Sequence, residues 1–132
     1  RVFPGESVSD ARMAFSQHLK KVSDSDLWLK ENPPILEWFE GQFESGKTDV
    51  EHSIINNLEM AYKEVNNSSS KIEGVTYGSD LRLFTNHADI PAVLFGPGDV
   101  RLAHSANEYV KIEEVLTCIK IISNLIINWC EE

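Results

Sequence analysis

The stretch Ile90-Pro91-Ala92-Val93-Leu94-Phe95-Gly96-Pro97-Gly98-Asp99-Val100-Arg101-Leu102-Ala103-His104, which continues to Glu108-Tyr109-Val110, decides the predicted fold. Its apolar run over 90–95 predicts a buried strand, and the Gly-Pro-Gly turn ends that strand. A loop then carries one histidine ahead of a long apolar segment, which predicts a largely buried helix over 108–129. Open α/β sheets present single side chains in this way at the carboxyl edge, where ligands bind. The stretch therefore indicates part of an enzyme, although one histidine alone does not make a metal site.

From residue 48 onward the chain alternates helix and strand, a pattern typical of a parallel sheet. The predicted elements are a helix over 49–65, a strand over 72–77, a short helix over 78–84, the strand over 90–95 and the helix over 108–129. Before residue 46 the order is strand, helix, strand, with Ser7 capping a helix over 8–22 and with a strand over 35–43. We therefore predict an α/β fold in two parts, residues 1–46 and residues 47–132.

The composition excludes some partners. The 132 residues suffice for one domain with a core, and 42% apolar with 25% charged residues is ordinary for a globular protein. The formal net charge of −9 disfavours nucleic acid or an anionic membrane as the main partner. The apolar run over 119–129 is too short, and too interrupted by polar residues, to span a bilayer. We expect no signal peptide, and the start without methionine indicates a piece of a larger protein.

The two cysteines, Cys118 and Cys130, lie in one predicted helix. Their spacing corresponds to a rise of about 18 Å, which is too long for a disulfide within that helix. We expect both thiols to be reduced and buried, which fits the cytosol, so the predicted location is cytoplasmic.

His104 has two interpretations. A histidine ahead of a helix is commonly a cap or a surface residue. A neutral imidazole that follows a glycine turn at a strand end is also well placed as a zinc ligand. Glu108, four residues further on, either orients His104 or favours the N-terminus of the helix.

The segment Gly78-Ser79-Asp80-Leu81-Arg82 also has two interpretations, which are compatible with each other. Backbone N–H groups at a helix start attract a carboxylate or phosphate, and Arg82 adds a bidentate donor. Alternatively, Ser79 or Asp80 is an N-cap and Arg82 pairs with Asp80. Arg1, as an isolated terminal residue, carries no signal of its own.

Four segments, in order along the chain, resemble the carboxyl-terminal third of the M20 family of metallopeptidases and deacylases. They are Arg1-Val2-Phe3-Pro4-Gly5-Glu6, Trp28-Leu29 with Pro33-Pro34-Ile35-Leu36-Glu37-Trp38, Gly78-Ser79-Asp80-Leu81-Arg82, and the stretch from Ile90-Pro91 to Glu108-Tyr109-Val110. The Trp, Pro-Pro and Glu-Trp segment is most similar to the acetylornithine-deacetylase-like branch.

The resemblance implies a mixed-sheet catalytic domain with two zinc ions, or with cobalt as a possible replacement, and an inserted α+β lid that carries the dimer contact. Residues 1–46 correspond to the second half of the lid, and residues 47–132 to the end of the catalytic domain. His104 corresponds to the last zinc ligand. Glu108 is our own candidate for the residue that orients His104. The implied substrate-binding residues are Arg1, Ser79, Asp80, Arg82, Gly96 and Gly98.

The implied activity is zinc-assisted removal of an acyl group from an N-acyl amino acid, a peptide or a related carboxylate-bearing amide. The remaining metal ligands and the glutamate base of the family lie upstream of these residues, so we expect this chain alone to be inactive. One alternative is a non-catalytic binding or dimerisation module on the same fold. Another is an acidic α/β interaction domain in which His104 is a cap.

Overall fold

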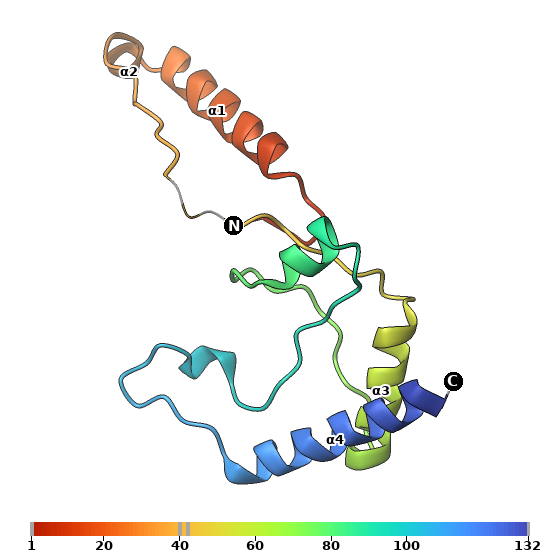
Figure 1. The fold of residues 1–132 in the computed structure, drawn as a ribbon. Helices are drawn as coiled ribbons and strands as arrows, with labels where there is room; N and C mark the ends of the chain where they lie inside the picture. Colours follow the sequence, from red (N-terminus) through yellow and green to blue (C-terminus); the bar gives the residue numbers. More distant parts are fainter. Residues whose placement is uncertain (1, 40, 42, 132) are drawn as a thin grey trace. The chain divides into compact units, whose positions relative to one another are not determined.

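The computed structural model describes residues 2–39, 41 and 43–131, and it divides into two compact units. The first unit comprises Arg1–Lys47 and Gly74–Asp89. The second comprises Thr48–Glu73 and Ile90–Glu132. Each unit is therefore built from two separate stretches of the chain (Figure 1).

The first unit contains helix α1 (Val8–Ser25), helix α2 (Leu27–Glu31) and the π-helical turn η1 (Leu83–His87). Ser7 caps α1 as predicted, since its hydroxyl accepts the backbone N–H of Asp10 at 3.3 Å. Asp26 separates α1 from α2 because its carboxylate accepts the backbone N–H groups of Trp28 and Leu29. This cap starts α2, a helix that the sequence pattern did not predict.

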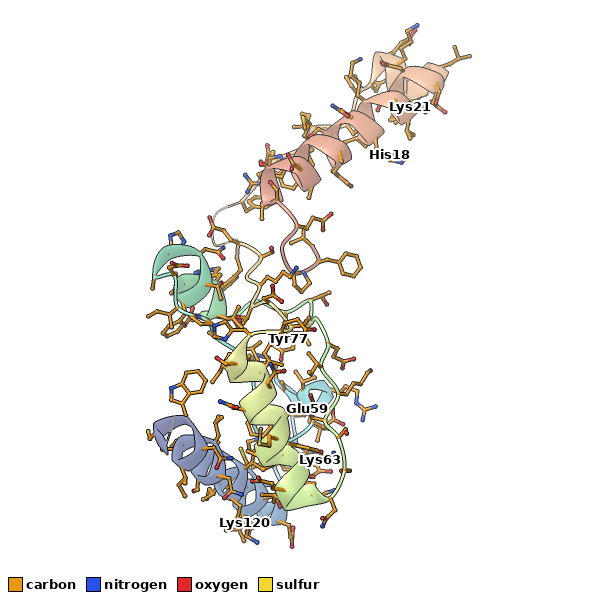
Figure 2. The ribbon with its side chains drawn as sticks, turned by 90° about the vertical axis from the view of Figure 1, so that its right-hand side faces the viewer. His18, Lys21, Glu59, Lys63, Tyr77 and Lys120 are labelled. Carbon is orange, nitrogen blue, oxygen red and sulfur yellow. The ribbon has the colours of Figure 1, made fainter. Side chains whose placement is uncertain are left out.

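The second unit contains helix α3 (Ser53–Asn66), the 3₁₀ turn η2 (Val100–Leu102) and helix α4 (Ile112–Glu131). Helix α3 packs against α4 (Figure 1). The buried apolar side chains of this unit come from both helices, namely Ile55, Ala61, Cys118 and Ile121. The exposed lysines Lys63 of α3 and Lys120 of α4 are labelled in Figure 2. The amphipathic helix predicted over 49–65 is confirmed, with its start moved to Ser53.

The predicted α/β fold with a mixed sheet is wrong. Across residues 2–39, 41 and 43–131 the regular elements are all helical, and the segments 72–77 and 90–95 contain no strand. The segment over 35–43 was also predicted as a strand, and its described residues form no strand either. An apolar run predicts burial and extension, but a strand exists only where a second backbone pairs with it. The described residues of these segments form no strand ladder, and Ile90 and Leu94 are about half exposed, at 51% and 45%.

Helix α4 differs from its predicted form in extent and in burial. It begins at Ile112 rather than residue 108, and only one of its apolar faces is covered. Cys118 and Ile121 are buried on the covered face, whereas Ile112, Ile119 and Ile126 are exposed. Both cysteines are free, as expected, but Cys130 is exposed rather than buried. In the described part of the chain, no helix has the length and apolar character needed to cross a membrane.

Candidate functional site

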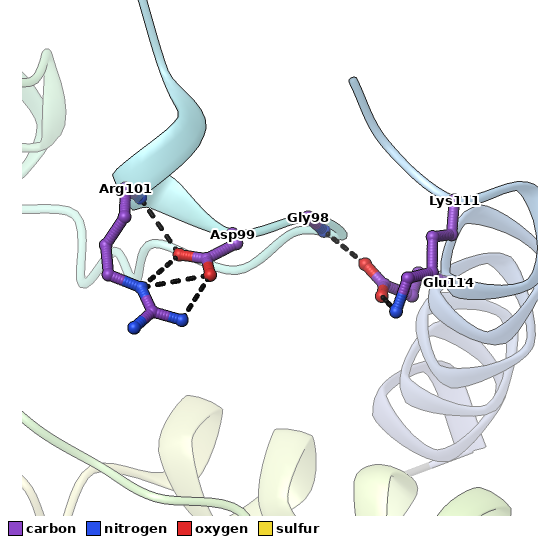
Figure 3. Close-up of polar contacts among 5 residues, drawn as sticks. All are labelled: Gly98, Asp99, Arg101, Lys111 and Glu114. Atoms are coloured by element: carbon purple, nitrogen blue, oxygen red, sulfur yellow. Dashed lines mark hydrogen bonds and ion pairs between the residues drawn. The ribbon is translucent and has the colours of Figure 1, made fainter. Parts of the chain in front are cut away.

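The loop that carries His104 is organised by its own hydrogen bonds. Asp99 caps η2, and its carboxylate accepts the backbone N–H of Arg101 at 2.9 Å. The Arg101 guanidinium closes on the same carboxylate, with Nε at 2.9 Å from Oδ1 and Nη2 at 2.5 Å from Oδ2 (Figure 3). Successive turns follow, in which Leu102 N–H donates to the Asp99 carbonyl and Ser105 N–H donates to the Leu102 carbonyl.

The pairing of Asp99 with Arg101 has an electrostatic consequence. The side-chain hydrogen bond from Arg101, followed by its backbone hydrogen bond, lowers the pKa of Asp99 from 3.8 to about 2. The same hydrogen bond raises the pKa of Arg101 above its usual value. Both groups are charged at physiological pH, and the lowered pKa of Asp99 lets the ion pair persist to lower pH.

The start of the loop is tied to helix α4. Gly98 donates its backbone N–H to the Glu114 carboxylate at 3.1 Å, and Lys111 lies 3.4 Å from the other oxygen of that carboxylate (Figure 3). Gly98 has a φ of +95°, a conformation that favours glycine. Gly96, two residues earlier, has open space where a Cβ would lie.

His104 is exposed and adopts a left-handed backbone conformation, with a φ of 62°. Its backbone N–H donates to the Glu108 Oε2 at 3.1 Å. Glu108 is also exposed, and it lies outside α4, whose acidic first-turn residues are Glu113 and Glu114. Of the two interpretations of Glu108, the geometry favours a contact with His104 over a role at the helix N-terminus.

The segment over 78–82, the other candidate binding segment, lies in the first unit and is organised around Phe43. The Arg82 guanidinium lies 4.8 Å from the centroid of the Phe43 ring. A Cβ at Gly78 would come within 2.8 Å of the same ring, so glycine allows the close approach of the backbone. The Ser79 hydroxyl accepts the backbone N–H of Leu81 at 3.4 Å, whereas η1 has no side-chain cap. Among the described residues, Arg82 makes no ion pair with Asp80.

The candidate residues thus fall into two groups. Ser79, Asp80 and Arg82 belong to the first unit, whereas Gly96, Gly98, His104 and Glu108 belong to the second. Arg1 lies outside the described residues.

Sequence reasoning missed the residues that fix the local geometry, chiefly Asp99, Arg101 and Glu114. The signal for the first two was available, because an aspartate after a glycine turn caps the next turn and brings an arginine two residues on within reach. The hydrogen bond between the Glu44 carboxylate and His87 Nε2, at 3.1 Å, joins residues 43 positions apart. Spacing along the chain carries no signal for such a contact.

A metal site needs more donors than these residues supply. Among the described residues, no group of three or more His, Cys, Asp or Glu side chains is placed to hold a metal ion. Structural and catalytic zinc sites take three or four protein ligands. The His104 imidazole fits the part of a single ligand, but the Glu108 carboxylate is engaged by a backbone N–H. A complete metal site is therefore not formed by this part of the chain.

Comparison with known proteins defines the class. Residues 35–128 match peptidase family M20/M25/M40. The N-formyl-4-amino-5-aminomethyl-2-methylpyrimidine deformylase of Bacillus subtilis (strain 168) is 32% identical in an alignment of length 139 that covers 97% of this chain and 32% of that protein. The deformylase of the same name from Halalkalibacterium halodurans is 30% identical in an alignment of length 141 that covers 97% of this chain and 32% of that protein.

A relative with a different name matches as well. The acetylornithine deacetylase of Myxococcus xanthus is 29% identical over 92 residues, which cover 70% of this chain and 24% of that protein. No solved structure matches the chain at a significant level. The family match spans most of the chain, so this chain belongs to peptidase family M20/M25/M40, and the predicted family is confirmed. The chain spans about a third of the length of the two deformylases.

Proposed function

We propose that the protein to which this chain belongs is a zinc-dependent amide hydrolase that removes a short acyl group from the nitrogen of a small substrate. The family match over residues 35–128, which includes the His104 loop, carries the proposal. The similar proteins are named as a deformylase and a deacetylase. These names support a formyl or an acetyl group as the acyl group that is removed. Within that class we propose an N-acyl amino acid, a peptide or a related carboxylate-bearing amide.

In this proposal each group of residues has its own task. His104 supplies one ligand of a zinc site, for which cobalt is a possible substitute, and the other ligands come from outside this chain. Bound zinc would lower the pKa of a water molecule and polarise the amide carbonyl. Arg1 and Arg82 supply positive charge for a substrate carboxylate, and the Phe43 ring supports the Arg82 guanidinium. Ser79, Asp80, Gly96 and Gly98 are the other proposed substrate-binding residues.

The proposal extends to the organisation of the protein. Residues 1–46 form part of a lid that carries the contact of a homodimer, and residues 47–132 form part of the catalytic domain. The free state of Cys118 and Cys130 supports a cytoplasmic location. The 132-residue chain alone is inactive, because His104 is the one proposed metal ligand that it contains and the general base lies elsewhere.

The test is hydrolysis by the full-length protein of a panel of N-formyl and N-acetyl amino acids and amines, before and after exhaustive chelation. The expected result is release of formate or acetate that is lost on chelation and restored by added zinc. Unchanged activity after chelation would contradict the zinc requirement. Absence of both hydrolysis and bound metal would favour the alternative, a non-catalytic binding or dimerisation module.

A further inference from the structure

The backbone of His104 is held in a conformation that side chains rarely adopt. With a φ of 62° it lies in the left-handed region, where a residue with a Cβ is uncommon, although histidine is among the more tolerated types. Within this chain the segment 103–110 is exposed throughout, so apolar packing from the chain's own residues contributes little to holding it. Among the contacts inside the chain, hydrogen bonds are therefore what keep His104 in this conformation.

Glu108 provides those hydrogen bonds from two sides. Its carboxylate accepts the His104 backbone N–H at 3.1 Å, and its own backbone N–H donates to the Ser105 carbonyl at 3.3 Å. The Ser105 backbone N–H in turn donates to the Leu102 carbonyl at 3.0 Å, in the turn that precedes His104. Residues 104–108 therefore form a closed loop that is anchored to the 3₁₀ turn η2.

The contact is with the backbone of His104 and not with its ring. A carboxylate behind a metal-binding histidine usually accepts the ring N–H and so fixes the tautomer. Within the described part of the chain, the hydrogen bond that His104 makes to Glu108 comes from the main chain, and neither ring nitrogen has a partner. The direction of the Cα–Cβ bond depends on the backbone conformation, so this contact sets where the ring points.

We propose that Glu108 is a positioning residue that acts through the His104 backbone amide: it holds the left-handed conformation from which the imidazole is presented to the metal. This inference rests on the proposed function for the role of the ring, but not for the backbone contact. The acceptor oxygen matters more than the charge, so an amide side chain at position 108 keeps most of the effect.

The test compares Glu108→Ala and Glu108→Gln in the full-length protein, with Glu113→Ala as the matched control. Glu113 is an exposed acid in the first turn of α4, so its loss changes the net charge by the same amount. Two quantities are measured: hydrogen exchange of the His104 amide in the metal-free protein, and zinc affinity by competition with a chelator. We expect Glu108→Ala to speed exchange and to weaken zinc binding by about 10- to 100-fold. We expect Glu108→Gln and Glu113→Ala to stay close to the wild type.

Unchanged exchange in Glu108→Ala would overturn the proposed positioning. So would an equal loss in Glu108→Gln, because the charge rather than the acceptor would then be responsible. The exchange measurement needs no metal, so its result is independent of the proposed function. Faster exchange with unchanged zinc affinity would contradict the presentation of the ring. If His104→Ala also left zinc binding unchanged, the proposed ligand itself would be wrong.

Discussion

Asp99 and Arg101 form an ion pair in which hydrogen bonds from Arg101 lower the pKa of Asp99 and the same side-chain contact raises the pKa of Arg101. The pair lies five residues or fewer from His104 in the chain, and it fixes the turn from which the His104 loop starts. The Asp99 carboxylate accepts hydrogen bonds from both the backbone N–H and the guanidinium of Arg101. The Asp99 side chain therefore orients the whole turn.

Replacing Arg101 by leucine is expected to raise the pKa of Asp99 from about 2 towards 3.8, because the guanidinium hydrogen bonds are lost. The folded-state pKa lies below that of the unfolded chain. The pair therefore stabilises the fold above about pH 3.8, and this contribution is lost as the pH falls through about 2. An NMR titration of the Asp99 carboxyl carbon in both proteins measures the shift. The same midpoint in wild type and variant would contradict the assigned cause.

At the scale of elements, Thr48 connects the entry of α3 to the segment over 90–95. Its hydroxyl donates to the Ala92 carbonyl at 2.5 Å and accepts the Ala92 backbone N–H at 3.0 Å. One hydroxyl thus satisfies two half-buried backbone groups that have no partner in a strand ladder.

Thr48→Val keeps the shape of the side chain and removes both hydrogen bonds, so the free energy of unfolding should fall by about 1–3 kcal/mol. Thr48→Ser keeps the hydroxyl and should cost less. Denaturant unfolding of the full-length variants gives both values. A valine variant as stable as the serine variant would show that the Ala92 backbone has other partners.

The elements also show what the sequence pattern predicts well. Apolar spacing predicted α1 and α3, and the Ser7 cap was predicted at the correct residue, because these signals are local. The cap of α3 was missed, since it is the Nδ1 of His52 that accepts the Ile54 backbone N–H, and histidine is not among the usual capping residues. The strands were wrong because pairing is non-local. An apolar run over 90–95 cannot specify its neighbour.

The candidate site residues show the same difference between local signals, which the sequence pattern predicts, and contacts between distant residues, which it does not. The sequence pattern singled out His104 and Glu108 but not their link through the backbone, which depends on a positive φ. It singled out Arg82 but not the Phe43 ring beside it, because these residues lie far apart in the chain. The assignment of substrate-binding and metal-binding roles remains a prediction.

At the scale of the whole molecule, helix α4 has two apolar faces. One packs against α3 through Cys118 and Ile121, while the other exposes Ile112 at 74%, Ile119 at 55% and Ile126 at 55%. These three isoleucines recur every seven residues, so they form one stripe along the helix. Exposed apolar stripes of this kind mark surfaces that bind other protein.

The isolated 132-residue chain is therefore expected to self-associate at micromolar concentration. Replacing Ile119 and Ile126 by lysine should reduce this association, because both changes place charge on the exposed stripe without touching the α3 contact. Sedimentation velocity on both proteins distinguishes the species. A monodisperse wild-type monomer would contradict the expectation.

The central claim is that His104 binds zinc in an amide hydrolase, and the most direct measurement is the zinc content of the purified full-length protein. His104→Ala is compared with the wild type and with His18→Ala, since His18 is an exposed histidine of α1 (Figure 2). We predict two zinc ions per subunit in the wild type and in His18→Ala, and one lost or weakly held ion in His104→Ala. Equal zinc content and affinity in all three proteins would contradict the claim.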